Sequence, residues 1–206
     1  MITVWGRASS SNVQKVVWTL DELGVPFERI DLGREFGGLD TDDYLGMNPN
    51  GRIPTVKDGD VILWESQAIC RYLCRTYEGA ALLPEDPAAA AHVEKWMDWN
   101  IAHLAPSVFP MFLQAREAND IAVARDARFE KLVAEAQKNL AILNDALAGQ
   151  DYLCGDAFTL ADLTVSVSLS RWAFVGFDLS GFDALAAWEA RVGERPACRQ
   201  HNVVTF

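Results

Sequence analysis

Four small polar side chains lie in the loop between the first apolar stretch of the chain and the first helical pattern. They are Ser9, Ser10, Ser11 and Asn12. A helix N-terminus has unpaired backbone N–H groups and a partial positive charge, which favour an anion. Hydroxyl and amide side chains there can donate further hydrogen bonds to the same anion. The segment is therefore a candidate for holding a reactive anion, and capping of the helix by one of these side chains is the plainer alternative.

Two further polar segments stand at the borders of expected strands and helices. Residues 48–54, Asn-Pro-Asn-Gly-Arg-Ile-Pro, end in an Ile-Pro pair before a short apolar stretch, and Glu65 and Ser66 stand where a later helix should begin. Taken alone, Glu65 is an acid that favours a helix N-terminus, and Pro54 is an ordinary proline at the start of a strand.

Motifs of several other enzyme classes are absent from the sequence. The three histidines, His92, His103 and His201, have no metal-ligand spacing, and no HExxH, P-loop, GxGxxG or GxSxG motif occurs. We therefore expect no metal site and no dinucleotide site. No cysteine precedes Cys70, so the first loop cannot supply a protein thiol.

The elements that must position these residues fall into two halves. Apolar and β-branched runs alternate with helical spacing in residues 1–78, which predicts the order β-α-β, an irregular connection and β-β-α, with a mixed sheet. Residues 79–86 contain a proline and little periodicity and are expected to form a linker. Residues 87–206 are expected to be all-helical. Within them, Thr159 and Asp162 have capping-box spacing, and Phe158 is placed as the hydrophobic staple.

Two apolar patterns define helices in the second half. One face of a long helix is expected at positions 93, 96, 97, 100, 101 and 104, and a second at 129, 132, 136, 140, 143 and 147. Residues 160–174 are apolar nearly all round, which is typical of a helix at the centre of a bundle.

Composition and charge exclude several roles. The 206 residues are 50% hydrophobic and 23% charged, and the formal net charge is −11. An acidic surface repels nucleic-acid backbones and anionic lipid, so we expect neither partner. No signal peptide or membrane span is expected. The four cysteines form no close pair, which indicates reduced thiols and a cytoplasmic location.

The chain resembles the cytosolic glutathione S-transferases along almost its entire length. The similarity is carried by residues 10–16, 48–54, 64–69 and 158–162, in this order and followed by a helical second half. It implies a thioredoxin-like α/β N-terminal domain that binds glutathione and an all-α C-terminal helical bundle that shapes the electrophile pocket. It also implies a homodimer.

The resemblance assigns roles in glutathione binding. A cis bond between Ile53 and Pro54 would turn the Ile53 backbone outward, where it could pair with the cysteinyl backbone of glutathione. Ser66 suits the γ-glutamyl carboxylate, and Glu65 suits the ammonium group beside it. Arg52 and Lys15 are cations placed to meet the glycine carboxylate, and each could equally be a solvated surface charge.

Catalysis then depends on the pKa of one thiol. Lowering that pKa from about 8.5 to about 6.5 requires roughly 2.7 kcal/mol of anion stabilisation. One hydroxyl donor supplies about 1.5–3 kcal/mol, and a helix N-terminus adds a few tenths to about one. Ser10 matches the residue of serine-type members, and Asn12 matches an amide that certain bacterial-type members place beside the sulfur. Ser11 is the nearest alternative, followed by Ser9.

The transferase class and the electrophile stay open. The first loop has no tyrosine, no cysteine and no Ser-Ser-Cys run, so the tyrosine-type, omega, beta and zeta patterns do not fit. Five aromatic residues are candidates for the electrophile pocket, although aromatic residues in helices are more often core: Trp99, His103, Phe109, Phe112 and Trp172.

Together these features predict a cytoplasmic, glutathione-dependent transferase. Its thiolate would attack a small, largely apolar electrophile, in conjugation, dehalogenation, or peroxide or disulfide reduction. A non-catalytic binding or interaction protein of the same fold is the alternative.

Overall fold

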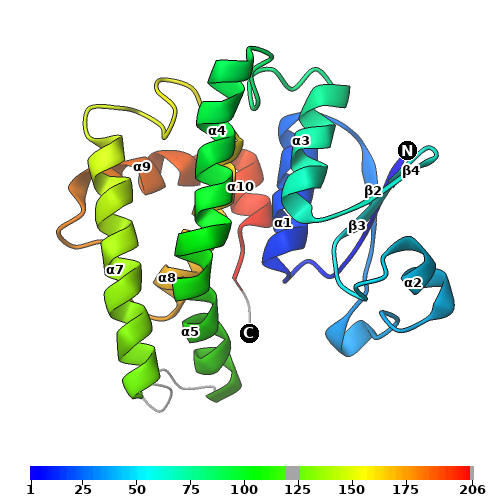
Figure 1. The fold of residues 1–206 in the computed structure, drawn as a ribbon, viewed down its shortest axis with the longest axis horizontal. Helices are drawn as coiled ribbons and strands as arrows, with labels where there is room; N and C mark the ends of the chain where they lie inside the picture. Colours follow the sequence, from blue (N-terminus) through cyan, green and yellow to red (C-terminus); the bar gives the residue numbers. More distant parts are fainter. Residues whose placement is uncertain (119–125, 205–206) are drawn as a thin grey trace.

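Four short strands form a single mixed sheet in the first third of the chain (Figure 1). The computed structural model describes residues 1–118 and 126–204. The strand order is β2-β1-β3-β4, in which β1 pairs parallel with β2 and antiparallel with β3, and β3 pairs antiparallel with β4. The strands are β1 (Ile2–Trp5), β2 (Phe27–Ile30), β3 (Thr55–Asp58) and β4 (Val61–Trp64).

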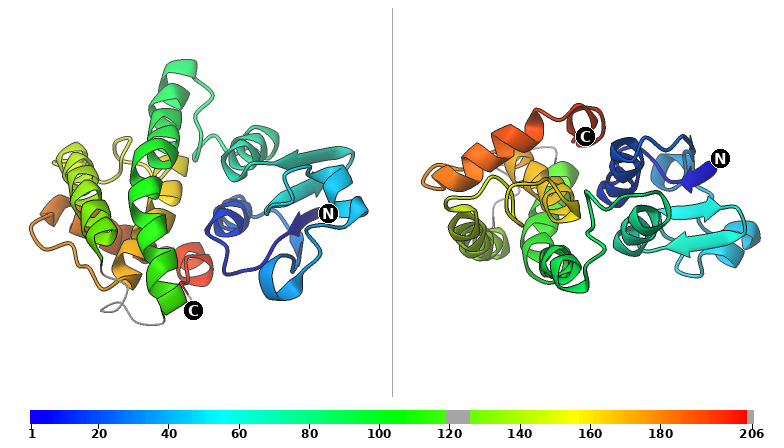
Figure 2. Two further views of the ribbon diagram at one scale, coloured as in Figure 1. Left: turned by 60° about the horizontal axis from the view of Figure 1, so that its bottom comes forward. Right: turned by 90° about the horizontal axis from the view of Figure 1, so that it is seen from above.

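Helices cover this sheet and link it to the second half. Helices α1 and α3 lie between the sheet and the helical domain, whereas α2 lies on the side away from it (Figure 2). The elements are α1 (Ser11–Glu22), the 3-10 turn η1 (Arg34–Phe36), α2 (Asp42–Met47) and α3 (Ser66–Thr76). The expected order β-α-β, connection, β-β-α is therefore present. Residues 77–86 contain no helix or strand, and the exact linker bounds 79–86 stay a prediction.

The second half is a helical bundle around α8. Helix α4 runs through the π turn η2 into α5 as one rod, and α7 packs beside it (Figure 1). Helix α8 is buried over most of its length and contacts α1, α4, α5 and α9. The elements are α4 (Pro87–Trp99), η2 (Asn100–Leu104), α5 (Ala105–Ala118), α7 (Ala127–Leu147), α8 (Leu160–Phe174), α9 (Asp183–Gly193) and α10 (Pro196–His201).

The π turn changes one expected helix face. Val93, Met97, Asn100 and Leu104 are buried as the periodicity predicts, but Ile101 is 51% exposed. Ile101 lies inside the π turn, which adds a residue to the helical repeat, so its direction departs locally from the 3.6-residue pattern. The amide Nδ2 of Asn100 anchors this turn by donating to the carbonyl of Thr164 on α8 at 2.9 Å.

The predicted capping box at the start of α8 is present. Asp162 is fully buried, and its carboxylate accepts from the backbone N–H of Thr159 at 2.9 Å and of Leu153 at 2.9 Å. The indole Nε1 of Trp188 donates to it at 2.8 Å. Asp162 therefore ties the loop before α8 and helix α9 to the central helix. Phe158 is buried and stacks on Trp18 of α1, with ring centroids 5.9 Å apart.

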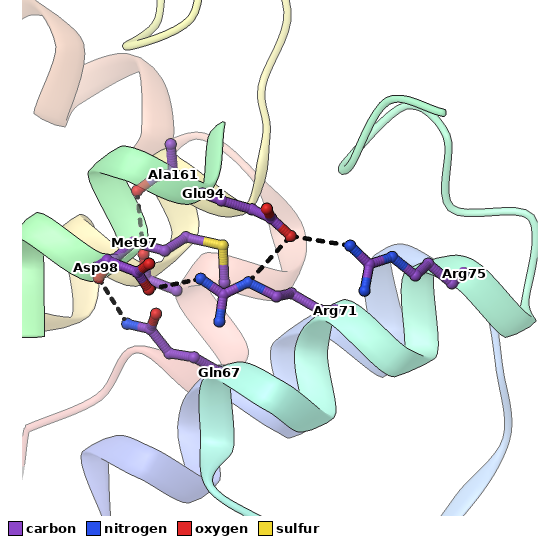
Figure 3. Close-up of polar contacts among 8 residues, drawn as sticks. Gln67, Arg71, Arg75, Glu94, Met97, Asp98 and Ala161 are labelled. Carbon is purple, nitrogen blue, oxygen red and sulfur yellow. Dashed lines mark hydrogen bonds and ion pairs between the residues drawn. The ribbon is translucent and has the colours of Figure 1, made fainter. Parts of the chain in front are cut away.

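Polar contacts join α3 to α4 across the two halves (Figure 3). Arg71 forms ion pairs with Asp98 at 2.6 Å and with Glu94 at 3.3 Å. The buried Gln67 amide donates to the carbonyl of Met97 at 3.0 Å. These contacts fix the orientation of α3, whose first residues line the candidate site.

Three findings concern the described part of the chain only. None of its helices combines the length and the apolar character that a membrane crossing requires. It contains no group of three or more His, Cys, Asp or Glu side chains that could hold a metal ion. Its four cysteines are free thiols.

Candidate active site

The N-terminus of α1 presents the polar segment predicted to hold an anion. Ser10 is the N-cap residue in an extended conformation and is 8% exposed, and its side chain makes no capping hydrogen bond. The helix instead begins with backbone bonds: Gln14 N–H donates to the carbonyl of Ser10 at 2.9 Å. The capping alternative therefore does not occupy the Ser10 hydroxyl, which stays available to a ligand.

Two cavities meet at this helix end. The first has a volume of about 460 Å³ and the second about 400 Å³. The first is lined by Arg7, Ser9, Ser10, Ser11, Asn12, Arg34, Leu39, Gly51, Arg52, Ile53, Phe109, Phe112, Leu113, Arg116 and Arg171. The second is lined by Ser11, Asn12, Lys15, Glu65, Ser66, Ile101, Ala105, Pro106, Phe109, Pro110 and Leu113. Both domains thus contribute walls, and the α1 residues common to the two cavities are Ser11 and Asn12.

The Asn12 side chain is held in a fixed orientation. Its Oδ1 accepts from Lys15 Nζ at 3.2 Å and from Ser66 Oγ at 3.3 Å. An ammonium group can only donate, so the atom facing Lys15 must be the amide oxygen. Among the described residues the amide nitrogen has no acceptor, and its two N–H donors remain for a ligand.

The Ile53–Pro54 peptide bond is cis, as the sequence predicts. Ile53 lines the first cavity, and within the described chain neither its N–H nor its carbonyl has a hydrogen-bond partner. These groups can pair with an extended peptide ligand.

A buried network holds the turn before this bond. Tyr44 Oη donates to the carbonyl of Arg52 at 2.6 Å, and Asn48 Nδ2 donates to the same carbonyl at 2.7 Å. Both side chains also contact Thr55 Oγ1, at 2.8 and 3.1 Å. Asn48 therefore holds the turn in position through hydrogen bonds inside the protein.

Glu65 and Ser66 form the far wall of the second cavity. Glu65 is the N-cap of α3 and has a φ of 73°, in the left-handed region that glutamate rarely adopts. Such a conformation costs about 1–3 kcal/mol and is concentrated at functional sites. Ser66 is 6% exposed. The Ser66 hydroxyl and the Glu65 carboxylate belong to adjacent residues at the start of α3.

Lys15 is a buried cation at the same wall. It is 3% exposed, and burial is the main cause that lowers its pKa to about 8. Arg52 lines the first cavity, whereas Lys15 lines the second, with Glu65 and Ser66. The structure therefore places Lys15 and Arg52 in different cavities, although the sequence suggested both for one carboxylate.

The five aromatic candidates divide into two that line a cavity and three that do not. Phe109 lines both cavities, and Phe112 lines the first. Trp99, His103 and Trp172 line neither cavity. Trp99 and His103 lie at the π turn. The ring of Trp99 packs edge-on against that of Trp96, with the ring centroids 5.3 Å apart.

Trp172 lies on another face of the bundle. Its ring stacks on that of Phe177, with the ring centroids 4.4 Å apart, and its Nε1 donates to the carbonyl of Asp178 at 3.1 Å. Trp172 is 2% exposed and belongs to the core between α8 and the turn before α9.

Sequence reasoning missed four charged residues that line the first cavity: Arg7, Arg34, Arg116 and Arg171. Arg171 had a signal, because it is the only charged residue in the apolar run from 163 to 174. The others are single charges in segments with little periodicity, and only the fold brings them together.

A mixed sheet with a cis-proline turn is thus joined to a helical bundle, and both domains form walls of the same cavities. The comparisons agree with this description. Residues 1–75 match the family model "Glutathione S-transferase, N-terminal domain", and residues 124–191 match "Glutathione S-transferase, C-terminal domain".

Relatives match over nearly the full chain. Glutathione S-transferase GstB of Escherichia coli strain K12 is 37% identical over 97% of both chains, and glutathione S-transferase 3 of Zea mays is 35% identical over 95% of this chain and 90% of its own. The solved theta class glutathione S-transferase of Xanthomonas axonopodis pv. citri, with glutathione bound, has a TM-score of 0.90 and 37% identity, over 99% of both chains.

The chain belongs to the glutathione S-transferase family. It is a glutathione-dependent transferase with glutathione as co-substrate, built from a thioredoxin-like N-terminal domain and a helical C-terminal domain. The expected family and fold class are confirmed. The individual site residues stay predictions.

Proposed function

We propose that glutathione lies across both cavities in an extended conformation. Its γ-glutamyl end meets Ser66, Glu65 and Lys15 in the second cavity. Its cysteinyl backbone pairs with the free N–H and carbonyl of Ile53 beside Pro54. Its glycine carboxylate lies toward Arg52 in the first cavity. This path places the sulfur at the wall that the two cavities share.

The sulfur then faces the donors of the α1 N-terminus. Asn12 carries the proposal, because Lys15 and Ser66 hold its oxygen and leave its N–H groups to donate. The Ser10 hydroxyl is a second donor, and Ser11 lies between them. Hydrogen bonds to a charged acceptor are the stronger kind, so these donors lower the pKa of the thiol and hold the thiolate without a general base.

The thiolate attacks an electrophile docked from the helical domain. Phe109, Phe112 and Leu113 form the apolar wall opposite α1. In substitution, the sulfur forms a bond to an electrophilic carbon, and the leaving group departs with its bonding electrons. Conjugation, dehalogenation, and peroxide or disulfide reduction all use this thiolate. A small, largely apolar electrophile fits the wall.

A non-catalytic binding protein of the same fold is disfavoured. Glu65, Ser66 and the cis Ile53–Pro54 turn are all in place, and a protein that no longer used glutathione would not need them together.

Two measurements on the purified protein test the function. We expect calorimetry to show micromolar-to-millimolar binding of reduced glutathione, and assays with 1-chloro-2,4-dinitrobenzene to show enzyme-dependent conjugate formation. Binding without conjugation of any electrophile in a panel would favour a carrier. Absence of glutathione binding would contradict the proposal.

The pKa of Lys15 makes ligand binding depend on pH. Burial lowers this pKa to about 8, so the free protein loses the Lys15 proton above that pH. A carboxylate bound beside the ammonium favours the charged form and raises the pKa again. Binding of S-methylglutathione, which has no thiol proton, should therefore take up a proton between about pH 8 and the bound-state pKa, and should weaken as pH rises through that window.

Calorimetry in buffers of different ionisation enthalpy measures this uptake. The same titration of a Lys15→Met variant measures the proton uptake by the ligand's own amino group. The difference between the wild type and the variant is the uptake by Lys15. Equal proton uptake by the wild type and the variant would show that Lys15 does not face the ligand carboxylate.

The protein is proposed to be a cytoplasmic homodimer. Strand β4 is the edge of the sheet, and its Val61, Ile62 and Trp64 are each about 40% exposed, which is a suitable surface for a second copy to cover. Four free cysteines suit a reducing compartment. Light scattering should give a mass of two chains, and Trp64→Asp should shift it toward one. A monomeric wild type would contradict the dimer.

A further inference from the structure

Five arginines line the first cavity: Arg7, Arg34, Arg52, Arg116 and Arg171. Its lining contains no aspartate or glutamate. This concentration of positive charge is unexpected in a chain whose net charge is −11. Burial contributes most to lowering the pKa of Arg7, Arg34 and Arg116 lower it further because like charges repel, and Glu35 acts in the opposite direction.

Within the described residues these arginines form no ion pair, although Glu35 acts electrostatically on Arg7 and Arg116, and Glu117 on Arg116. Ion pairs of arginine are found elsewhere, for example between Arg71 and Asp98 at 2.6 Å, and between Arg195 and Glu22 at 2.5 Å. Arg171 is buried, Arg7 and Arg116 are partly buried, and Arg34 and Arg52 are exposed. A buried cation without a counter-charge is costly, so a ligand that brings a negative charge to Arg171 and its neighbours would stabilise this group.

Arg171 gives the most specific evidence. It is 1% exposed, yet it lines the cavity, and its Nε–H has no hydrogen-bond partner. Its other N–H groups donate to uncharged acceptors, among them the carbonyl of Val167 at 2.9 Å and Gln14 Oε1 at 2.5 Å. The Nε–H of Arg7 is also buried and unpartnered. Two of the arginines that line the cavity thus each have a buried Nε–H without a hydrogen-bond partner.

Glutathione itself does not account for all these charges. In the proposed binding mode it brings only its glycine carboxylate into this cavity, and Arg52 answers it. Arg7, Arg34, Arg116 and Arg171 remain, and the same lining contains the apolar side chains of Phe112 and Leu113. An anionic group next to an apolar body would complement both.

We propose that the second substrate is an anionic electrophile whose carboxylate or sulfonate binds to Arg7, Arg116 and Arg171, with its apolar part against Phe112 and Leu113. This inference rests on the proposed function. The reaction with a chloroaryl carboxylate illustrates its balance. The glutathione thiolate forms a carbon–sulfur bond at the ring carbon that bears chlorine, the carbon–chlorine bond breaks, and chloride leaves with the bonding pair.

A matched pair of substrates tests the charge requirement. 4-Chloro-3-nitrobenzoate and 4-chloro-3-nitrobenzamide differ in charge at one end of the same ring. Because the two differ in intrinsic reactivity, the quantity to compare is the ratio of their kcat/KM values between protein variants. Arg116→Gln removes a charge from the cavity at a partly exposed position, and Lys131→Gln removes one from the exposed surface of α7.

The benzoate-to-benzamide ratio should fall about tenfold or more in Arg116→Gln and change less than twofold in Lys131→Gln. Thermal unfolding verifies that both variants fold. A ratio unchanged in Arg116→Gln, with the benzamide still turned over, would overturn the anion site and leave the transferase proposal standing. An equal fall in both variants would overturn it too, by showing a general field effect.

A binding measurement separates failure of this inference from failure of the function. The S-aryl glutathione conjugates of the two substrates need no turnover, and the carboxylate conjugate should bind the wild type about tenfold more tightly than the carboxamide conjugate. Equal affinities would overturn the anion site. Absence of binding by glutathione and both conjugates would overturn the function and the anion site together.

Discussion

Replacing Asn12 by alanine should raise the pKa of bound glutathione's thiol by about one to two units, because the alanine removes the donor whose orientation Lys15 and Ser66 fix. Each pKa unit corresponds to about 1.4 kcal/mol, within the range of one hydrogen bond to a charged sulfur. At pH 6.5 the thiolate fraction, and with it kcat/KM for 1-chloro-2,4-dinitrobenzene, should fall about 5- to 50-fold. At pH 9 the loss should shrink, because the thiol then ionises unaided.

The pH profile of kcat/KM distinguishes this role from a structural one. A positioning defect would lower the whole profile, whereas loss of a thiolate donor moves its lower limb to higher pH. Ser10→Ala and Ser11→Ala should shift the limb less than Asn12→Ala, and Gln137→Ala on the exposed face of α7 should not shift it. A larger shift in Ser10→Ala would transfer the principal role to Ser10.

Replacing Asp162 by alanine should lower the free energy of unfolding by about 3–5 kcal/mol, which is a large part of the stability of a typical domain. The substitution leaves the backbone N–H groups of Leu153 and Thr159 and the indole N–H of Trp188 without an acceptor in the interior. Each unpaired buried donor costs about 1–3 kcal/mol. Urea unfolding followed by circular dichroism measures the loss.

Two variants control for the Asp162 result. Asp156→Ala removes an exposed carboxylate from the same loop and should change stability by less than about 0.5 kcal/mol. Asp162→Asn keeps the shape and one acceptor oxygen, so its cost should be intermediate. If Asp162→Ala unfolded at the wild-type urea concentration, the proposed role of this carboxylate in joining the loop, α8 and α9 would be wrong.

The sequence predicts the fold well wherever local patterns decide it. Alternating and helical spacings identify the strands and helices of the first half, and the Thr159–Asp162 spacing identifies the capping box. The π turn is not visible in this way. It depends on the packing of Asn100 against α8, so the exposure of Ile101 could not be predicted from periodicity.

The candidate site is predictable where a residue's neighbours in sequence position it. The Ile53–Pro54 turn and the Glu65-Ser66 helix start are of this kind, and the structure places both at the cavities. Residues from distant segments are harder to predict. Lys15 and Arg52 both looked suited to one carboxylate, yet α1 and the turn before β3 direct them into different cavities.

The arginines beside the aromatic residues of the first cavity are a further feature that the sequence does not predict. Phe109 and Phe112 suggest an apolar pocket, and the sequence gives no reason to group Arg7 with Arg116 or Arg171. Arg7 is separated from each of the other two by more than a hundred positions, and the three line one cavity only because the fold brings α5 and α8 to the first loop of the other domain. The chemical character of a pocket between two domains therefore follows from packing.

The most direct test of the account is the pH titration of the thiolate absorbance of glutathione bound to the wild-type protein. The donors at the α1 N-terminus should give a bound-thiol pKa about two units below that of a free thiol, near 6.5. A bound-thiol pKa equal to that of free glutathione would contradict the claim that this helix end activates the sulfur.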